Sequence, residues 1–306
     1  MKTFTLAATL LMTGSSAWAD ATTGAAFLRI GTGARPEALG GAFTALADDV
    51  NALHYNPGGL SQLAKTEVGF THTQWLLDSK FDFAGIAQPF KFGTVGLAAS
   101  RLGTGSQEAR DENRRAIGDF SASDSAYALG FGRSLGSIGS YGTLGVGADL
   151  KYLESRIGSD SASTFALDAG AVHRLHNLPL SLGLSVLNVG RGMKFISQRD
   201  PLPLTIALGA AYGLRGLFNL VVDLRHEPYD HKSTVGAGVE YAVLPIFAIR
   251  AGYASPTATA MAGNTSILSG FGGGFGLKIR DYRADYTFTP FGELGNVQRI
   301  SLGARF

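Results

Sequence analysis

The chain has 306 residues, a formal net charge of +2 and a charged-residue share of 16%, well below the ~25% of an average soluble domain. It contains 42 glycines and no cysteine, which excludes a disulfide framework and a thiol site. No block rich in lysine and arginine is present, which argues against nucleic acid as a partner.

The N-terminus has the pattern of a secretory signal. Lys2 is followed by an apolar run over residues 4–12, and Ala17-Trp18-Ala19 forms an A-x-A cleavage site ahead of Asp20. The sequence therefore predicts a signal peptide over residues 1–19, with cleavage near Ala19. The run is too short to cross a bilayer as a helix. No later stretch has eighteen consecutive apolar residues, which excludes a helical membrane protein.

Residues 20–63 do not have the pattern of a membrane strand. Pro36 suits the first turn of a helix and apolar residues recur at Leu39 and Phe43, while the pair Gly40-Gly41 weakens the helix. We therefore expect a short, kinked helix. Because an apolar segment of this length is unfavourable in water, the sequence predicts that it lies as a hatch inside the lumen of a barrel.

Residues 64–306 resolve into short alternating segments separated by turn residues. Fourteen strands are expected, an even number, as in single-chain bacterial outer-membrane barrels. The expected strands cover residues 65–74, 80–90, 93–102, 125–135, 142–155, 163–175, 180–188, 203–213, 217–227, 232–242, 246–254, 268–280, 282–288 and 298–306. Tight turns alternate with longer loops, as expected for the periplasmic and extracellular sides. The predicted fold class is all-β, a fourteen-stranded antiparallel transmembrane barrel with a short N-terminal hatch. A soluble β-sandwich is the alternative.

Polar and apolar residues alternate along these segments. Leu150 and Tyr152 would face lipid, while their neighbours Asp149 and Lys151 would face the lumen. The charges expected to line the lumen are Asp149, Lys151, Asp168, Asp223, Arg225, Glu240, Arg250, Arg283 and Asp285. Because charges of both signs in a narrow lumen satisfy one another, we interpret them as pairs that close the lumen or hold the hatch. A ladder that lines a path for ions or substrate is the alternative.

The last eight residues alternate in the same way and end on Phe306. Ile300 and Leu302 share a face with Phe306, and Arg299 and Arg305 lie on the opposite face. A final strand leaves an open edge unless it pairs with the first strand. Phe306 is therefore expected to mark the strand that closes the barrel.

Three patterns that carry chemistry in other proteins have simpler explanations here. The segment Gly132-Arg133-Ser134-Leu135-Gly136 fits the hydrolase pattern G-x-S-x-G, but it lies at the end of an expected strand with no helix after it. The six histidines lack metal-ligand spacing. The group His226, Glu227, Asp230 and His231 lies on one expected outer loop and could bind a cation weakly, although a solvated loop is favoured. No catalytic residue, metal site or cofactor is predicted.

Three short motifs resemble the hatch of FadL-type outer-membrane proteins. They are Leu39-Gly40-Gly41-Ala42-Phe43, Ala47-Asp48-Asp49 and Tyr55-Asn56-Pro57-Gly58-Gly59-Leu60. Within that superfamily, the run AFLRIGTGAR over residues 26–35 is similar to the opening of the PorV/PorQ family. The hatch residues singled out by the resemblance are Asp48, Asp49, Asn56, Pro57, Gly58 and Gly59, and Gly58 departs from the alanine of the usual motif.

The resemblance implies a plugged barrel in the outer membrane of a Gram-negative type of cell, with one of two roles. FadL relatives pass hydrophobic molecules such as long-chain fatty acids, often through a lateral opening. PorV-like proteins bind or shuttle secreted cargo with the type IX secretion machinery. The expected partners are outer-membrane lipids and either hydrophobic small molecules or secreted protein cargo, with a monomer favoured. A scaffolding barrel and an outer-membrane lipid hydrolase acting through Ser134 are the remaining alternatives.

Overall fold

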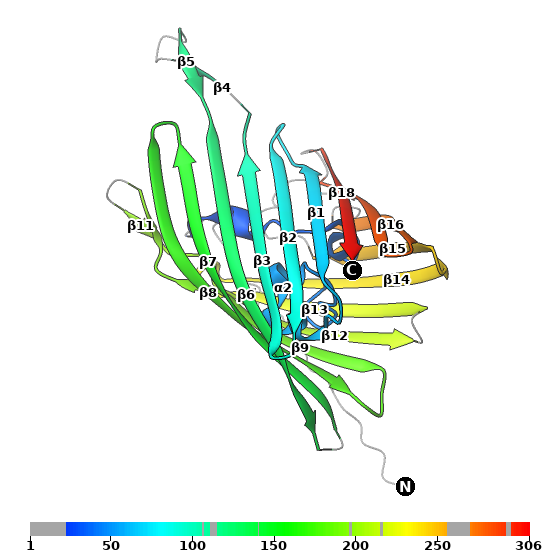
Figure 1. The fold of residues 1–306 in the computed structure, drawn as a ribbon. Helices are drawn as coiled ribbons and strands as arrows, with labels where there is room; N and C mark the ends of the chain where they lie inside the picture. The colour runs from blue at the N-terminus through cyan, green and yellow to red at the C-terminus, as the bar shows by residue number, and fades with distance from the viewer. Residues whose placement is uncertain are drawn as a thin grey trace.

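The protein is an antiparallel β-barrel closed on itself (Figure 1). The computed structural model describes residues 23–306 except 106, 111–114, 140, 196–197, 215–216, 256–269 and 292–294. Fourteen strands form the barrel, and β1 pairs with β18 to complete the ring, with Glu67 opposite Arg305. The barrel strands are β1 (Glu67–Gln74), β2 (Lys80–Phe90), β3 (Gly93–Gly103), β6 (Ala122–Ile138), β7 (Gly142–Ile157), β8 (Asp160–Leu175), β9 (Leu180–Gly190), β12 (Thr205–Leu214), β13 (Phe218–Glu227), β14 (Lys232–Leu244), β15 (Phe247–Ala254), β16 (Phe271–Ile279), β17 (Tyr282–Pro290) and β18 (Asn296–Arg305).

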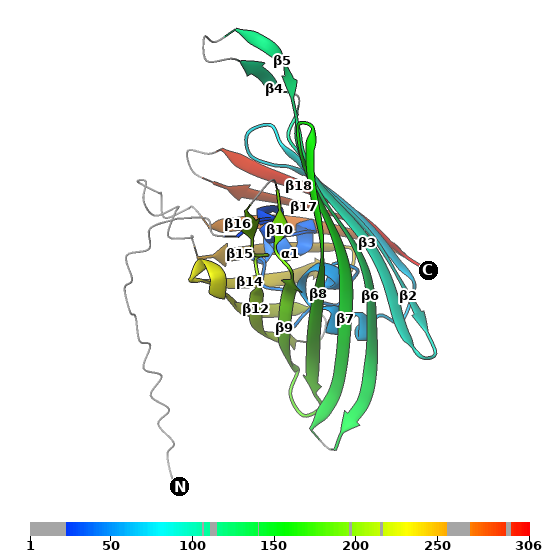
Figure 2. The ribbon, with the colours of Figure 1, turned by 90° about the vertical axis from the view of Figure 1, so that its left-hand side faces the viewer.

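The predicted fold class is confirmed, strand for strand. Strands β6, β7 and β8 are longer than expected, at 17, 16 and 16 residues. Two short hairpins in the long loops were not expected: β4 (Gln107–Arg110) with β5 (Ala116–Phe120), and β10 (Met193–Lys194) with β11 (Arg199–Asp200). The β4–β5 hairpin projects well beyond the rim of the barrel (Figures 1 and 2).

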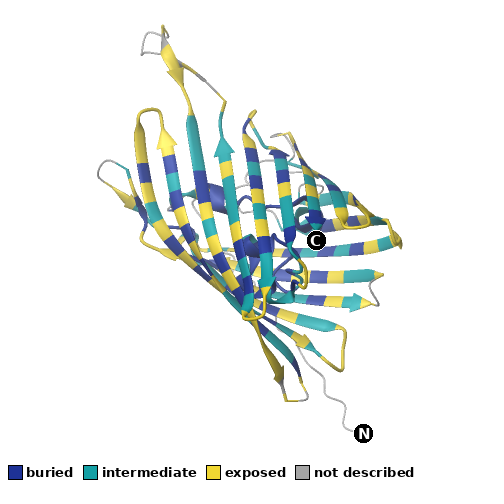
Figure 3. Ribbon diagram, in the orientation of Figure 1, coloured by how far each residue is buried: buried dark blue, intermediate teal, exposed yellow. Residues whose placement is uncertain are grey.

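Burial alternates along the barrel strands as the polar and apolar pattern indicates (Figure 3). On β7, Asp149 and Lys151 are 1% and 5% exposed, while Leu150 between them is 44% exposed. The exposed side chains form the apolar exterior that a transmembrane barrel presents to lipid. Among the described residues, no helix combines the length and the hydrophobicity needed to cross a membrane.

The described part of the expected hatch, residues 23–63, lies inside the barrel (Figure 2). Its elements are η1 (Ala26–Arg29), α1 (Ala34–Ala38), α2 (Ala52–Tyr55) and η2 (Pro57–Gln62), and a fifth short helix, η3 (Pro228–Asp230), follows β13. Helix α1 has only five residues, and the chain then turns at Gly40 and Gly41, which have φ values of 67° and 69°. The predicted signal peptide and its cleavage site near Ala19 lie outside the described residues.

The hatch backbone lies directly against glycines on the lumen face of the wall. A Cβ added at Gly238 would lie 2.6 Å from the Leu39 Cα, and one added at Gly252 would overlap the Gly40 nitrogen. The hatch backbone also approaches glycines of β6, β7, β9 and β12, whereas on β1–β3 the side chains of Val50 and Leu53 lie against the glycines. The high glycine content therefore has a specific use, because a side chain at these positions would occupy the space of the hatch.

Replacing a lumen-face glycine that contacts the hatch should loosen the hatch. We expect Gly252→Ala to destabilise the seated hatch by ~1–3 kcal/mol through overpacking. In a chain without cysteine, Ala52→Cys provides a reporter in α2, where Ala52 is fully buried. The rate of maleimide labelling at position 52 should rise roughly tenfold or more in the Gly252→Ala background.

Gly273→Ala on the adjacent strand β16 is the matched control, because its added Cβ would meet its nearest atom at 3.7 Å. Equal labelling rates in the two alanine variants would contradict the seating of the hatch on glycine.

Candidate functional site

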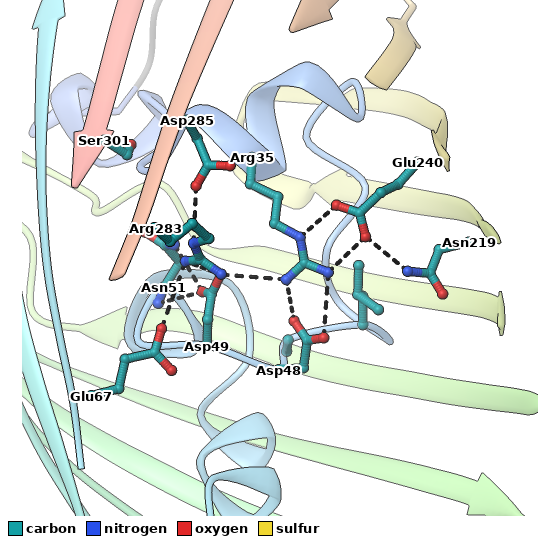
Figure 4. Close-up of polar contacts among 12 residues, drawn as sticks. Arg35, Asp48, Asp49, Asn51, Glu67, Asn219, Glu240, Arg283, Asp285 and Ser301 are labelled. Atoms are coloured by element: carbon teal, nitrogen blue, oxygen red, sulfur yellow. Dashed lines mark hydrogen bonds and ion pairs between the residues drawn. The ribbon is translucent and has the colours of Figure 1, made fainter. Parts of the chain in front are cut away.

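Arg35 connects the hatch to the barrel wall (Figure 4). It extends from α1, and its Nε and Nη2 donate to the two carboxylate oxygens of Glu240 on β14 at 2.8 and 2.9 Å. Its Nη1 also donates to Asp48 Oδ1 at 2.5 Å. Burial favours the neutral form of Arg35, but Asp48 and Glu240 outweigh it and raise the pKa of Arg35 above its ordinary value. The guanidinium therefore stays charged inside the lumen.

Asp49 forms the second connection. Its carboxylate is fully buried, lies 2.9 Å from Arg283 Nη2 on β17, and accepts the Asn51 N–H and Nδ2 at 2.9 and 2.8 Å. Burial would raise the pKa of Asp49, but Arg283 and Arg35 outweigh it and hold the pKa below its usual range. The predicted pair Asp48 and Asp49 thus lies between arginines, and Asp49 contacts the wall directly.

The wall charges continue this network. Glu240 pairs with Arg250 at 2.6 Å, and Arg250 and Arg283 reach Asp285 at 2.8 and 2.9 Å. The four predicted wall residues Glu240, Arg250, Arg283 and Asp285 are therefore brought together on β14, β15 and β17, next to Arg35. Pairs of this kind, with most donors and acceptors used, are strongly destabilised when one member is removed.

Sequence reasoning did not assign Arg35, Glu37 and Glu67 to the site. Glu37 lies 2.9 Å from Arg299 Nη2, and Glu67 lies 3.0 Å from Arg305 Nε. For Arg35 and Glu37, the available signal was the presence of isolated charges in a largely apolar hatch, because a buried charge requires a partner. Glu67 lies on β1, outside the hatch.

The turn motif Asn56-Pro57-Gly58-Gly59 attaches the hatch to β8. Asn56 is fully buried; its Nδ2 donates to the carbonyls of Thr44 and Ala171 at 2.7 and 3.0 Å, and its Oδ1 accepts the Gly58 N–H at 3.0 Å. Pro57 begins η2, and a Cβ at Gly58 would lie 2.8 Å from the Ala171 Cα. This close approach to β8 explains glycine at position 58, where the usual motif has alanine.

Asp223 and Arg225 on β13 also contact the hatch. Asp223 Oδ2 accepts the backbone N–H groups of Phe43 and Thr44, both at 2.8 Å. The Arg225 guanidinium carbon lies 5.7 Å from the centre of the Tyr55 ring, a cation–π arrangement. A wall carboxylate therefore satisfies backbone donors that the short hatch elements leave free.

The remaining predicted lumen charges lie on β7 and β8. Lys151 Nζ is 2.5 Å from Asp168 Oδ2 and 3.1 Å from Asn188 Oδ1, and Asp168 Oδ1 accepts the Asn188 N–H at 2.7 Å. Asp149 is buried on the same face of β7. Where β1 and β18 close the barrel, the Phe306 N–H donates to the Thr66 carbonyl at 2.9 Å.

The charged outer loop after β13 differs from its expectation as a solvated loop. Arg29 of η1 bridges Glu227, at 2.8 Å, and Asp230, so the loop holds the upper end of the hatch. Opposite charge and the limited exposure of the two carboxylates, 10% each, explain the difference. No cluster of three or more metal-binding side chains occurs in the described part of the chain.

Ser134 lies near the C-terminal end of strand β6, where its Oγ accepts the Gly136 N–H at 3.2 Å. The chain then reverses into β7, whereas the hydrolase motif requires a strained turn into a helix. The G-x-S-x-G match therefore does not have the local structure of a nucleophile.

One sector of the wall contacts the hatch mostly through apolar side chains. Val50 lies against Gly69 and Gly85, and Leu53 lies against Gly96 and Gly130. Among the described residues, no hydrogen bond or ion pair joins the hatch to β2, β3 or β6. On the outside of this sector, the wall has a hollow of about 710 Å³ lined by Val68, Ala84, Leu97, Ala99, Tyr127 and Leu129, with eight further residues of the same strands and of β7 and β8.

The comparisons with known proteins agree with this architecture. The CymD monoaromatic hydrocarbon channel has a TM-score of 0.61 at 12% identity over 90% of this chain and 98% of that chain. The toluene transporter TodX of Pseudomonas putida gives 0.60 at 14% identity over 90% and 96%. The toluene transporter TbuX of Ralstonia pickettii gives 0.59 at 12% identity over 90% and 98%. The chain has the fold of these channels.

A structure of a FadL homologue from Pseudomonas aeruginosa is also similar, with a TM-score of 0.54 at 12% identity over 87% of this chain and 95% of that chain. Residues 5–152 match the model of an uncharacterised protein family, UPF0164. That match spans the hatch and the barrel strands from β1 to most of β7. No curated protein sequence matches the chain significantly.

Removing a wall carboxylate should release the hatch. Glu240→Gln leaves Arg35 and Arg250 without their shared anion, so we expect the seated state to lose ~3–5 kcal/mol. Labelling of a cysteine at position 52 should become much faster. Lys65→Met is the control, because Lys65 and Asp281 are more than half exposed and such a pair contributes ~0–1 kcal/mol. Similar effects of the two substitutions would argue against a buried clamp.

His54 should make the hatch sensitive to acid. Burial, then Lys151 and Arg225, lowers the pKa of His54 to about 3 from an ordinary value of 6.5. A displaced hatch therefore binds one more proton between these values, so the seated hatch is most stable above pH 6.5 and loses stability as the pH falls toward 3. His54→Gln should reduce this loss. The measurement is the unfolding midpoint in detergent at pH 7, 5 and 4. Carboxylates titrate alike in both proteins, so identical midpoint shifts would contradict the assignment.

Proposed function

We propose that this chain is an outer-membrane channel for hydrophobic compounds, opened when the hatch moves. The observation that carries the proposal is the uneven attachment of the hatch. Ion pairs and hydrogen bonds hold it to β13, β14, β17 and β18, and Asn56 holds it to β8. Val50 and Leu53, in contrast, make only apolar contacts with the glycines of β1–β3 and β6 behind the hollow. A small displacement of α2 would break apolar contacts there without separating any buried ion pair.

The hollow suggests the direction of passage. It opens on the lipid-facing side of β1–β3 and β6–β8 and is lined almost entirely by apolar side chains. A hydrophobic compound that crosses this sector would enter lipid directly and avoid the aqueous periplasm. The names of the structural neighbours, monoaromatic hydrocarbon channel and toluene transporter, support compounds of this class.

The other expectations remain predictions. The signal peptide cleaved near Ala19, a monomeric state and the affiliation with the PorV/PorQ family go with the outer-membrane proposal. A role with type IX secretion cargo requires co-purification with that machinery from native membranes. A scaffolding barrel predicts no transport at all, and a hydrolase predicts activity that Ser134→Ala abolishes.

Transport is tested with the full chain in the outer membrane of Gram-negative cells, where the polar lipopolysaccharide leaflet slows the entry of toluene, and the same cells without the chain give the baseline. Accelerated exchange of toluene across the outer membrane supports the proposal, and exchange at the baseline rate with the folded chain present would remove it. The path is tested by Ala99→Phe, which places a ring in the hollow and should slow the exchange several-fold.

Ala251→Phe is the matched control, since Ala251 is an exposed alanine on β15 outside the hollow. Transport that is slowed equally by both substitutions, or by neither, would leave a channel but contradict passage through this sector of the wall.

A further inference from the structure

Asp149 is an isolated buried carboxylate. It is 1% exposed on the lumen face of β7, and neither carboxylate oxygen has a hydrogen-bond partner among the described residues. An unpaired charge in such a site is strongly unfavourable, so a group of this kind requires a positive partner.

Among the described residues, the elements around Asp149 supply no such partner. On β7, Lys151 is already 2.5 Å from Asp168, the residue directly opposite Asp149 on β8. On β9, Asn188 is bonded to both Lys151 and Asp168. On β6, the residue opposite Asp149 is Gly130, and a Cβ there would overlap Asp149 Oδ1. The charges of Asp149, Asp168 and Lys151 sum to one negative charge.

The hatch closes the site without neutralising it. Leu53 of α2 occupies the space beside Gly130 that the Asp149 carboxylate also borders. The next residue, His54, is neutral near pH 7, because burial and the nearby Lys151 and Arg225 lower its pKa to about 3. Asp149 therefore faces an apolar side chain of the hatch, and the seated hatch provides no cation.

We propose that the Asp149 carboxylate binds one small monovalent cation from solution, a proton or a sodium ion, while the hatch is seated. When α2 leaves the wall, Asp149 is hydrated and the cation is released. Binding and seating are then linked, so the cation stabilises the seated hatch and its removal favours displacement. This inference depends on the contact of the hatch with the wall beside Asp149, and it is independent of whether the barrel transports anything.

The test measures hatch displacement in the full-length protein in detergent. The rate of maleimide labelling at Ala52→Cys is expressed relative to the unfolded chain in the same buffer, which removes the pH dependence of the thiol. The pH is varied from 6 to 9, and sodium chloride is exchanged for choline chloride at constant ionic strength. Wild-type Asp149, Asp149→Asn and the control Asp160→Asn, an exposed residue at the start of β8, are compared.

If the cation is a proton, labelling of the wild type rises with pH by up to about tenfold per unit, without sodium dependence. If it is sodium, labelling rises on exchange for choline at constant pH. In both cases Asp149→Asn labels slowly under all conditions and Asp160→Asn behaves as the wild type. An unresponsive wild type overturns the proposal and needs no variant. Faster labelling of Asp149→Asn under all conditions also overturns it, because Asp149 would then have a stabilising partner within the chain.

Discussion

The structure depends on the contact between a polypeptide backbone and a wall of glycine. A closed barrel of fourteen strands encloses a lumen that must be filled by side chains, water or another segment of chain. Here the lumen faces of many strands have no side chain at the level of the hatch, so the hatch backbone reaches the wall itself. The hatch elements are too short to satisfy their own backbone groups, and wall residues such as Asp223 and hatch residues such as Asn56 supply the missing partners.

Charge then makes the attachment directional. Arg35 and Asp49 each pair with a residue of opposite charge on β14 or β17, and these pairs are buried among further ions. On the opposite side, β2, β3 and β6 meet the hatch through Val50, Leu53 and Leu60. Separating a buried ion pair costs several kcal/mol, whereas sliding an apolar contact along glycine costs much less. The hatch is therefore expected to pivot on its charged side and move away from its apolar side, where the outer wall is hollowed.

The alternation of polar and apolar residues along the sequence was sufficient to predict the barrel. Alternation of period two fixed which residues face lipid, as for Leu150 between Asp149 and Lys151, and the turns fixed the number of strands. The pairing of charges could not be predicted in the same way, because Arg35 and Glu240 are 205 positions apart. Alternation places Glu240 on the lumen face but says nothing of its level relative to the hatch. Asp149 shows the same limit. The sequence places it on the lumen face like Lys151, but only the structure shows that Lys151 has a partner and that Asp149 has none among the described residues. The contact of the glycines with the hatch could not be predicted either, because it depends on where the hatch lies in the lumen.

The most direct test of this account is amide hydrogen exchange of the hatch in the purified, folded protein. The account expects the amides of Phe43 and Thr44, which donate to Asp223, to be protected to a degree similar to amides in the middle of the barrel strands. Exchange of residues 39–47 at the rate of an unstructured peptide, with the barrel strands still protected, would show that the hatch does not occupy the lumen.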